Sequence, residues 1–247
     1  HAMQYAVNNG AYTNIVLLPG EYPSSFSVLK DNLSIYGFDY ADSGDHPATH
    51  IWVNDISLNA GLVISGRSNV TVAGLEFVGS TPDYTYVDDP IRVNTISPVY
   101  IINSGSGGAV SLTNNTFSNF DRAIEVLSSQ NVAIRGNTFT GFDVASTEGA
   151  AVLRLTLSGN TIPVFVERNL FQNNSIVHPT DTVPAYNNSI VLSNMSQMQF
   201  YGNRMTGNSG TSLVTIDMWT NYGIDVQAGR NVMFSNAIYA NTTVAAL

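Results

Sequence analysis

The chain has 247 residues, a formal net charge of −9, and only 11% charged against 44% hydrophobic residues. Its polar groups are mostly uncharged (46 Ser or Thr and 27 Asn), a composition that excludes a helical bundle or a coiled coil. With Lys30 as its sole lysine and no apolar run of membrane-spanning length, the sequence predicts neither nucleic-acid binding nor membrane insertion, and the absence of cysteine excludes thiolate chemistry.

One sequence motif, here called the phrase, recurs along the chain. It consists of two apolar residues with one residue between them, then two further residues, an Asn, one residue of any type and a third apolar residue. The complete copies are Val110, Leu112, Asn115 and Phe117; Val132, Ile134, Asn137 and Phe139; Val164, Val166, Asn169 and Phe171; and Met198, Phe200, Asn203 and Met205. An earlier copy, with Val70, Val72, Leu75 and Phe77, has Leu in place of Asn. A last copy, with Val232, Phe234, Asn236 and Ile238, is one residue shorter. The five Asn are 22, 32, 34 and 33 residues apart. Such periods indicate a repeat architecture, and the alternation indicates short strands.

A further strand lies eleven residues before the Asn. Its inward residues are expected to be Ile124 and Val126 in one repeat, Ile190 and Leu192 in a later one, and Ile224 and Val226 in the last. Each repeat therefore predicts three strands and an Asn corner. Stacked repeats place equivalent strands about 4.8 Å apart, so the Asn side chains are expected to form one hydrogen-bonded column.

With these repeats, the sequence resembles the pectate-lyase-like superfamily. The resemblance implies an all-β fold, a single-stranded right-handed parallel β-helix, with Gln4–Val7 as a short N-terminal capping helix and Ile15–Tyr22 as the first coil. We expect one domain over residues 4–247, open to being part of a longer protein, after a cloning scar at residues 1–3. The resemblance also implies a secreted protein, or one on a cell or virion surface, whose partner is a polysaccharide or cell-surface glycan.

In that superfamily, polysaccharide lies along the face of the first strand of each coil. The residues expected to point outward there are Val63, Glu125, Arg154, Val191 and Asp225. Arg154 takes this place only if the turn after its strand is longer than in neighbouring repeats. Glu125 beside Arg154 then offers a carboxylate and a guanidinium suited to a uronate or sulfate group, or else a surface ion pair of at most about 1 kcal/mol.

Loops beside this face contribute the remaining candidate residues. They are Asp143 and Glu148 as catalytic acids alongside Glu125 and Arg154, Tyr84, Tyr86, Arg92, Tyr100 and His178 as substrate-binding residues, and Asp88 and Asp89 as metal ligands. Calcium prefers such oxygen ligands, although two acids before a proline are equally typical of a turn. We expect weak calcium binding at best, and no required cofactor.

Two classes of function remain open. One is a polysaccharide lyase or glycoside hydrolase. A hydrolase would need a loop acid, since Glu125 and Asp225 are too far apart, whereas a lyase would need Arg154 or Tyr100 as its base. The other is a non-catalytic surface module such as an adhesin or tailspike segment. The fold alone does not separate them, because function depends on the site.

Overall fold

The computed structural model describes residues 2–22, 26–38, 49–53, 60–79, 97–120, 122–145, 151–158, 161–177, 189–195, 197–210, 212–216, 232–234, 236–239 and 242–243. Most of these residues lie in strands, and every strand pair among them is parallel. The expectation of an all-β class with a short N-terminal helix is confirmed.

The strands form four parallel sheets. Sheet A contains β1 (Asn14–Leu17), β4 (Leu33–Gly37), β7 (Val70–Ala73), β10 (Val110–Thr113), β13 (Val132–Arg135), β17 (Val164–Glu167), β21 (Met198–Tyr201) and β25 (Val232–Phe234). Sheet B contains β2 (Gly20–Glu21), β5 (Thr49–Val53), β8 (Glu76–Gly79), β11 (Thr116–Ser118), β14 (Thr138–Thr140), β18 (Leu170–Gln172), β22 (Arg204–Thr206) and β26 (Ala237–Tyr239).

The other two sheets contain fewer strands. Sheet C contains β3 (Phe26–Val28), β6 (Ala60–Ser65), β9 (Ser97–Ile102), β12 (Ile124–Leu127), β16 (Ala151–Ser158), β20 (Ser189–Met195) and β24 (Ser212–Ile216). Sheet D contains β15 (Asp143–Ala145), β19 (Ser175–Val177), β23 (Ser209–Gly210) and β27 (Thr242–Thr243). Sheet D was not predicted.

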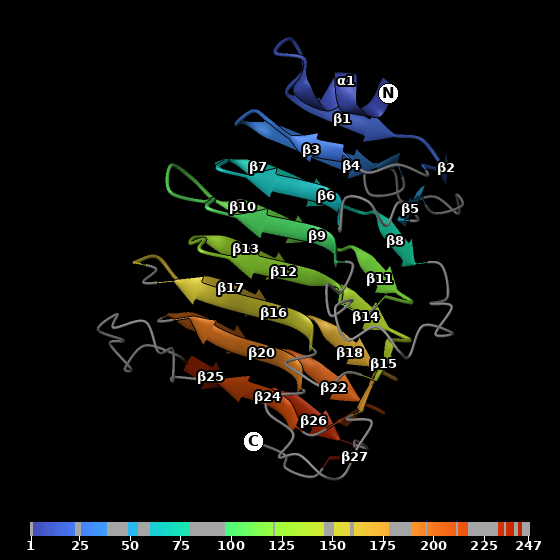
Figure 1. The fold of residues 1–247 in the computed structure, drawn as a ribbon, viewed down its shortest axis with the longest axis vertical. Helices are drawn as coiled ribbons and strands as arrows, with labels where there is room; N and C mark the ends of the chain where they lie inside the picture. The colour runs from blue at the N-terminus through green and yellow to red at the C-terminus, as the bar shows by residue number, and fades with distance from the viewer. Residues whose placement is uncertain are drawn as a thin grey trace.

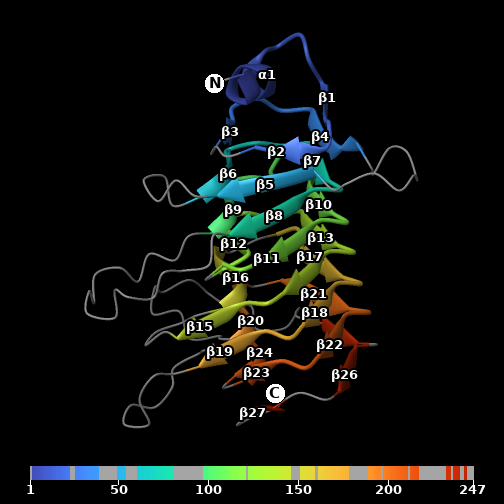
Figure 2. The ribbon, with the colours of Figure 1, turned by 90° about the vertical axis from the view of Figure 1, so that its right-hand side faces the viewer.

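The chain visits the sheets in a fixed order, A, then B, then C, with sheet D inserted between B and C from β15 onward. Each new strand pairs with its equivalent from the previous round, so the described strands stack from the N-terminal to the C-terminal end (Figure 1, Figure 2). We call one such round a repeat. The predicted periodicity therefore corresponds to the register of the sheets.

Helix α1 (Ala2–Asn8) lies at the N-terminal end of this stack, above β1 and β3 (Figure 1). Its Val7 is fully buried, and the Gln4 side chain donates to the Ser27 carbonyl and accepts from the Ser27 amide, at 2.9 and 2.8 Å. The helix thus covers apolar residues and satisfies backbone groups at the end strand β3. The prediction of a helix over Gln4–Val7 is confirmed.

Inward side chains of the repeats form one apolar core. Phe77, Phe117, Phe139 and Phe171 stack in sheet B, with successive ring centroids 4.9, 5.2 and 4.6 Å apart. All four are fully buried. Burial of such rings is the main stabilising contribution of each repeat, at about 25 cal/mol per Å² of apolar area.

The Asn column at the corner between sheets A and B is confirmed. Asn137 Oδ1 accepts from both the backbone N and Nδ2 of Asn115, at 2.9 and 3.1 Å, while Asn137 Nδ2 donates to the Leu112 carbonyl at 2.9 Å. Asn169, Asn203 and Asn236 continue the same pattern. Each buried amide thereby satisfies the backbone groups that the corner takes out of the sheets.

A second column, which was not predicted, turns the chain from sheet B into sheet D. Asn208 Oδ1 accepts from the backbone N and Nδ2 of Asn174, and Asn174 Oδ1 accepts from the Phe142 amide. Asn174 and Asn208 each follow the first column by five residues. The two columns fix two of the corners in the later repeats, the one from sheet A to sheet B and the one from sheet B to sheet D.

Near the C-terminus, the predicted alignment of the last repeat with the one before it was wrong by one residue. Val232 lies opposite Gln199, one position beyond the expected equivalence with Met198. The last described strand of sheet C is β24, whereas Ile224 and Val226, expected to hold that place, lie outside the described residues.

Candidate functional site

The outward face of sheet C carries one column of side chains across successive strands. In register it runs Val63, Tyr100, Glu125 and Arg154, and the backbone positions of Leu192 and Thr215 continue the same register. Neighbouring members are about 4.8 Å apart along the stack. The predicted adjacency of Glu125 and Arg154 is therefore confirmed, and Tyr100 joins them on the other side of Glu125.

Arg154 reaches this column because its repeat has a longer turn, as expected. In β12, Val126 precedes Val132, the first residue of the next sheet A strand, by six residues, whereas Leu155 in β16 precedes Val164, the first residue of β17, by nine. The extra residues follow a register shift after Leu155.

The expected outward position of Val191 is wrong. Val191 is fully buried and lies opposite Leu153, while the backbone of Leu192 is in register with Arg154. The run Ile190, Val191, Leu192 is apolar throughout, and a period of two cannot set its phase. Asp225, the last member expected in this column, lies outside the described residues.

Glu125 forms its ion pair with Arg122 instead of Arg154. Arg122 Nη1 donates to Glu125 Oε2 at 2.6 Å, and the two side chains are 5% and 19% exposed. Arg122 lies three residues before Glu125, at the corner that leads into β12. The sequence did not predict this contact, because Arg122 precedes the strand and follows no strand periodicity. The buried guanidinium of Arg122 thus holds the Glu125 carboxylate in place and offsets its charge.

Arg154 is left as the cation of this face. It is half-buried, and no ion pair joins it to any other residue that the structure describes. Because the Glu125 carboxylate is engaged by Arg122, the guanidinium of Arg154 keeps its planar donors available to a ligand.

Tyr100 is a half-buried phenol on the opposite side of Glu125. Burial raises its pKa above the ordinary 10.0, the charge of Glu125 raises the pKa further, and Arg122 acts against both. The hydroxyl therefore stays protonated throughout the neutral range. Tyr100 can donate a hydrogen bond to a ligand and offer its ring for stacking.

The remaining candidates do not join this cluster among the described residues. Asp143 was expected in a loop but begins β15, where it lies opposite Ser175 in sheet D, on a different sheet from Glu125. A strand of three residues with little alternation escapes sequence analysis. The other predicted site residues lie outside the described residues: Tyr84, Tyr86, Asp88, Asp89, Arg92, Glu148 and His178.

A search of the described residues for groups of three or more His, Asp or Glu side chains able to hold a metal ion finds none. No helix in the described part of the chain combines the length and apolar character needed to cross a membrane. The column on sheet C therefore offers one cation, one paired carboxylate and one phenol for chemistry.

Comparison with known proteins gives no assignment: no family model, curated protein or solved structure matches the chain.

Proposed function

We propose that the chain is a right-handed parallel β-helix of the pectate-lyase-like type and that the outward face of sheet C binds an acidic polysaccharide. The fold proposal is supported by the recurring A, B, C strand order and by the Asn column at one corner. The proposal includes a location outside the cell or on a cell or virion surface, where such polymers occur.

The observation that carries the binding proposal is the state of Arg154. A half-buried guanidinium with no ion pair to a described residue retains its affinity for a carboxylate or sulfate group. The chain's net charge of −9 opposes an anionic ligand at long range, but salt screens exposed charges beyond about 8 Å at physiological ionic strength. Contact with Arg154 then decides the affinity.

Tyr100 and Glu125 fit the neutral part of the same sugar chain. The Tyr100 phenol lies two strands from Arg154 in register, with Glu125 between them. A ring that stacks on a pyranose and a carboxylate that accepts from its hydroxyls complete a surface running along the stack. Non-catalytic binding is the function that this arrangement supports best.

Eliminative cleavage of the bound polysaccharide is the second candidate. Arg154 would neutralise the uronate carboxylate, and Tyr100, once ionised, would take the proton from the carbon next to that carboxylate. The C–O bond to the leaving sugar would break as a C=C bond forms, and the leaving oxygen would take a proton from water. Because the pKa of Tyr100 is raised above 10.0, such activity would increase with pH into the alkaline range. Glu125 would then position the sugar.

Polygalacturonate binding to the wild-type chain, measured by calorimetry, tests the proposal. Arg154→Ala should weaken this binding by about 1.5 to 3 kcal/mol, the range for a hydrogen bond to a charged group. Glu125→Gln, which preserves shape, should change it less. Unchanged affinity in Arg154→Ala would refute the site. Appearance of unsaturated uronate products, followed by ultraviolet absorbance, would assign the enzyme instead of the binding module.

A further inference from the structure

Three arginines gather at the corner between sheets A and B in three successive repeats. Arg135 ends β13, Arg168 follows β17 directly, and Arg204 begins β22. All three are exposed, with the Arg135 side chain at 47%. They are three of only nine basic residues in a chain of net charge −9. We call this group the arginine corner.

The only acid among the described side chains at this corner is buried. Glu167 is 8% exposed and is bound at both oxygens by Arg135, whose Nε and Nη2 lie 2.8 and 3.3 Å away. The Tyr201 hydroxyl also bonds to Glu167, and this bond is the main cause that raises the Tyr201 pKa. Arg135 is thus engaged by Glu167, whereas no ion pair joins Arg168 to another residue that the structure describes.

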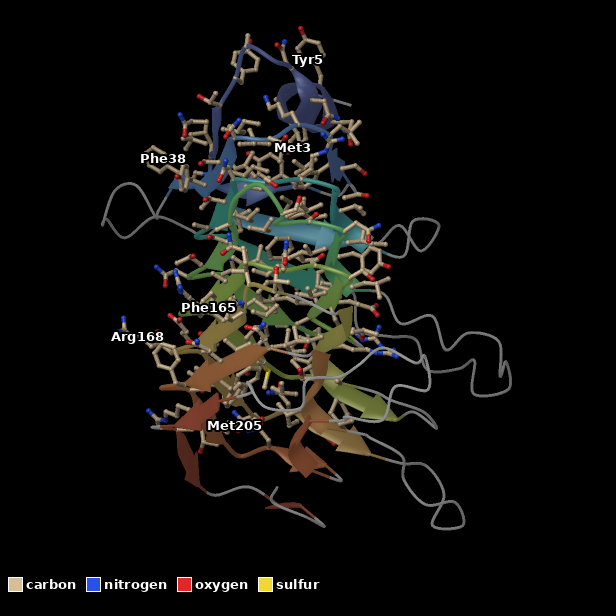
Figure 3. The ribbon with its side chains drawn as sticks, turned by 90° about the vertical axis from the view of Figure 1, so that its left-hand side faces the viewer. Met3, Tyr5, Phe38, Phe165, Arg168 and Met205 are labelled. Carbon is tan, nitrogen blue, oxygen red and sulfur yellow. The ribbon has the colours of Figure 1, made fainter. Side chains whose placement is uncertain are left out.

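Aromatic rings border the charged groups. The Arg135 guanidinium carbon lies 5.5 Å from the centroid of the Phe165 ring, and Phe165 is half-buried on the outward face of β17. Tyr201 is the next residue in register after Glu167. Figure 3 shows Phe165 and Arg168 on the outer side of the stack. Rings beside cations are suited to a ligand that is both cyclic and anionic.

Arg168 adopts a backbone conformation that its residue type disfavours. Its φ is 54°, and the equivalent positions in other repeats are Gly74, Asn114, Gly136 and Gly202. Glycine and asparagine tolerate the left-handed region, while other residues are strained there. Arg168 also lies over Gly202, where the position of an added Cβ would be 3.4 Å from Arg168 Cγ. The chain thus carries an exposed guanidinium at a position that favours a smaller residue.

We propose that the arginine corner is a binding site for an anionic polysaccharide bearing sulfate or carboxylate groups. The guanidinium of Arg168 pairs with an anionic group, Arg204 adds a second exposed charge beside it, and Tyr201 contacts the sugar rings. Their positions step diagonally from sheet A to sheet B, about 4.8 Å per repeat along the stack, so an extended chain can meet them in succession. This site is independent of the sheet C face and does not rest on its function.

The test measures binding of heparin and of polygalacturonate, as sulfate and carboxylate probes, to single variants at fixed low salt. Arg168→Gln should weaken at least one probe about 10-fold or more, as expected for a lost charge-assisted hydrogen bond, and Arg204→Gln should weaken it less. Arg168→Lys should retain most of the affinity. Arg67→Gln, which removes the same charge at a turn between sheets C and A, is the matched control and should leave binding unchanged.

Two outcomes would overturn the proposal: wild-type affinity for both probes in Arg168→Gln and Arg204→Gln, or tighter binding of a single-stranded oligonucleotide than of either glycan. Arg168→Asn adds a second readout, since it should raise the melting temperature while weakening glycan binding. A gain in stability with no loss of binding would show a purely structural residue. Combining Arg168→Gln with Arg154→Ala separates the two proposals. Additive losses of glycan affinity require two sites. If only one of the two substitutions lowers the affinity, only the site that contains it is supported.

Discussion

The same three residue types meet at two places in the molecule with opposite outcomes. On sheet C, Tyr100, Glu125 and Arg122 form one group, and on sheet A, Tyr201, Glu167 and Arg135 form another. In the first group the arginine is buried, at 5% exposure, and the carboxylate is the more exposed partner. In the second the carboxylate is buried, at 8%, and the arginine is 47% exposed.

The comparison shows that the buried partner decides which charge faces solvent. Sheet C therefore presents a carboxylate beside Arg154, and the corner of sheet A presents guanidiniums. The two pairs also differ in sequence distance: Arg122 and Glu125 are three residues apart, whereas Arg135 and Glu167 meet across neighbouring strands, 32 residues apart. One pair is fixed by a local turn and the other by the repeat.

The largest effect is expected from Arg122→Met, which should lower the free energy of unfolding by about 3 kcal/mol, because it leaves the partly buried Glu125 without its counter-charge. Arg135→Met is the matched change in the other pair. It should cost only about 1 kcal/mol, since Glu167 keeps the bond from Tyr201 and removal of the half-exposed guanidinium that covers it opens its carboxylate to water. Urea unfolding of both variants measures the difference, and equal losses would remove the distinction between the two pairs.

A smaller change of opposite sign is expected at the arginine corner. Arg168→Asn should stabilise the chain by about 0.5 to 1 kcal/mol, because asparagine is less strained than arginine at positive φ. The reciprocal change, Asn114→Arg, places arginine at the equivalent position two repeats earlier and should destabilise it by a similar amount. Thermal unfolding measures both. A loss of stability in Arg168→Asn would mean that packing of the arginine stem on Gly202 outweighs the strain.

Much of the fold could be predicted because its determinants repeat in the sequence. The Asn phrase identified the column at Asn115, Asn137, Asn169 and Asn203, and the alternation identified the strands. In three successive repeats, the residue two positions before the Asn belongs to the second ion-paired group: Arg135, Glu167 and Tyr201. Each of these residues alone resembles an ordinary outward side chain. Only aligning these positions across repeats would have found the group.

The errors in the site have physical causes too. Val191 was misplaced because a continuous apolar run does not record which residue faces the core. Arg122 was missed because its bond to Glu125 crosses a corner, where neither the strand period nor the helix period applies. Asp143 was placed in a loop because β15 has three residues and one of them is exposed and charged.

The two tyrosines should respond differently to loss of their glutamates. Glu167→Gln should lower the pKa of Tyr201 toward its ordinary 10.0, because the bond to the carboxylate is the largest cause of its rise. Glu125→Gln should leave the pKa of Tyr100 raised, since burial is the largest cause there. Spectrophotometric titration against Tyr201→Phe and Tyr100→Phe references isolates each phenol. An equal fall in both would contradict this assignment of causes.

These raised pKa values also link stability to pH. A phenol that ionises less readily in the folded chain than in the unfolded chain favours folding below about pH 10, and this contribution disappears as pH rises through the folded pKa. Tyr100→Phe should therefore flatten the alkaline loss of stability, which unfolding at a series of pH values would measure. A steeper alkaline loss would reverse the sign of the shift.

The smallest effect on stability is expected from Arg154→Ala. Arg154 is half-buried beside Glu125 but has no ion pair with a described residue, so its removal should change the free energy of unfolding by less than about 0.5 kcal/mol. Arg122→Met, which acts on the same carboxylate from the buried side, is the contrast. Parallel urea unfolding and polygalacturonate binding separate the roles: Arg154→Ala should lose binding and keep stability. A loss of stability comparable to that of Arg122→Met would make Arg154 a structural partner of Glu125 and leave sheet C without a cation for a ligand.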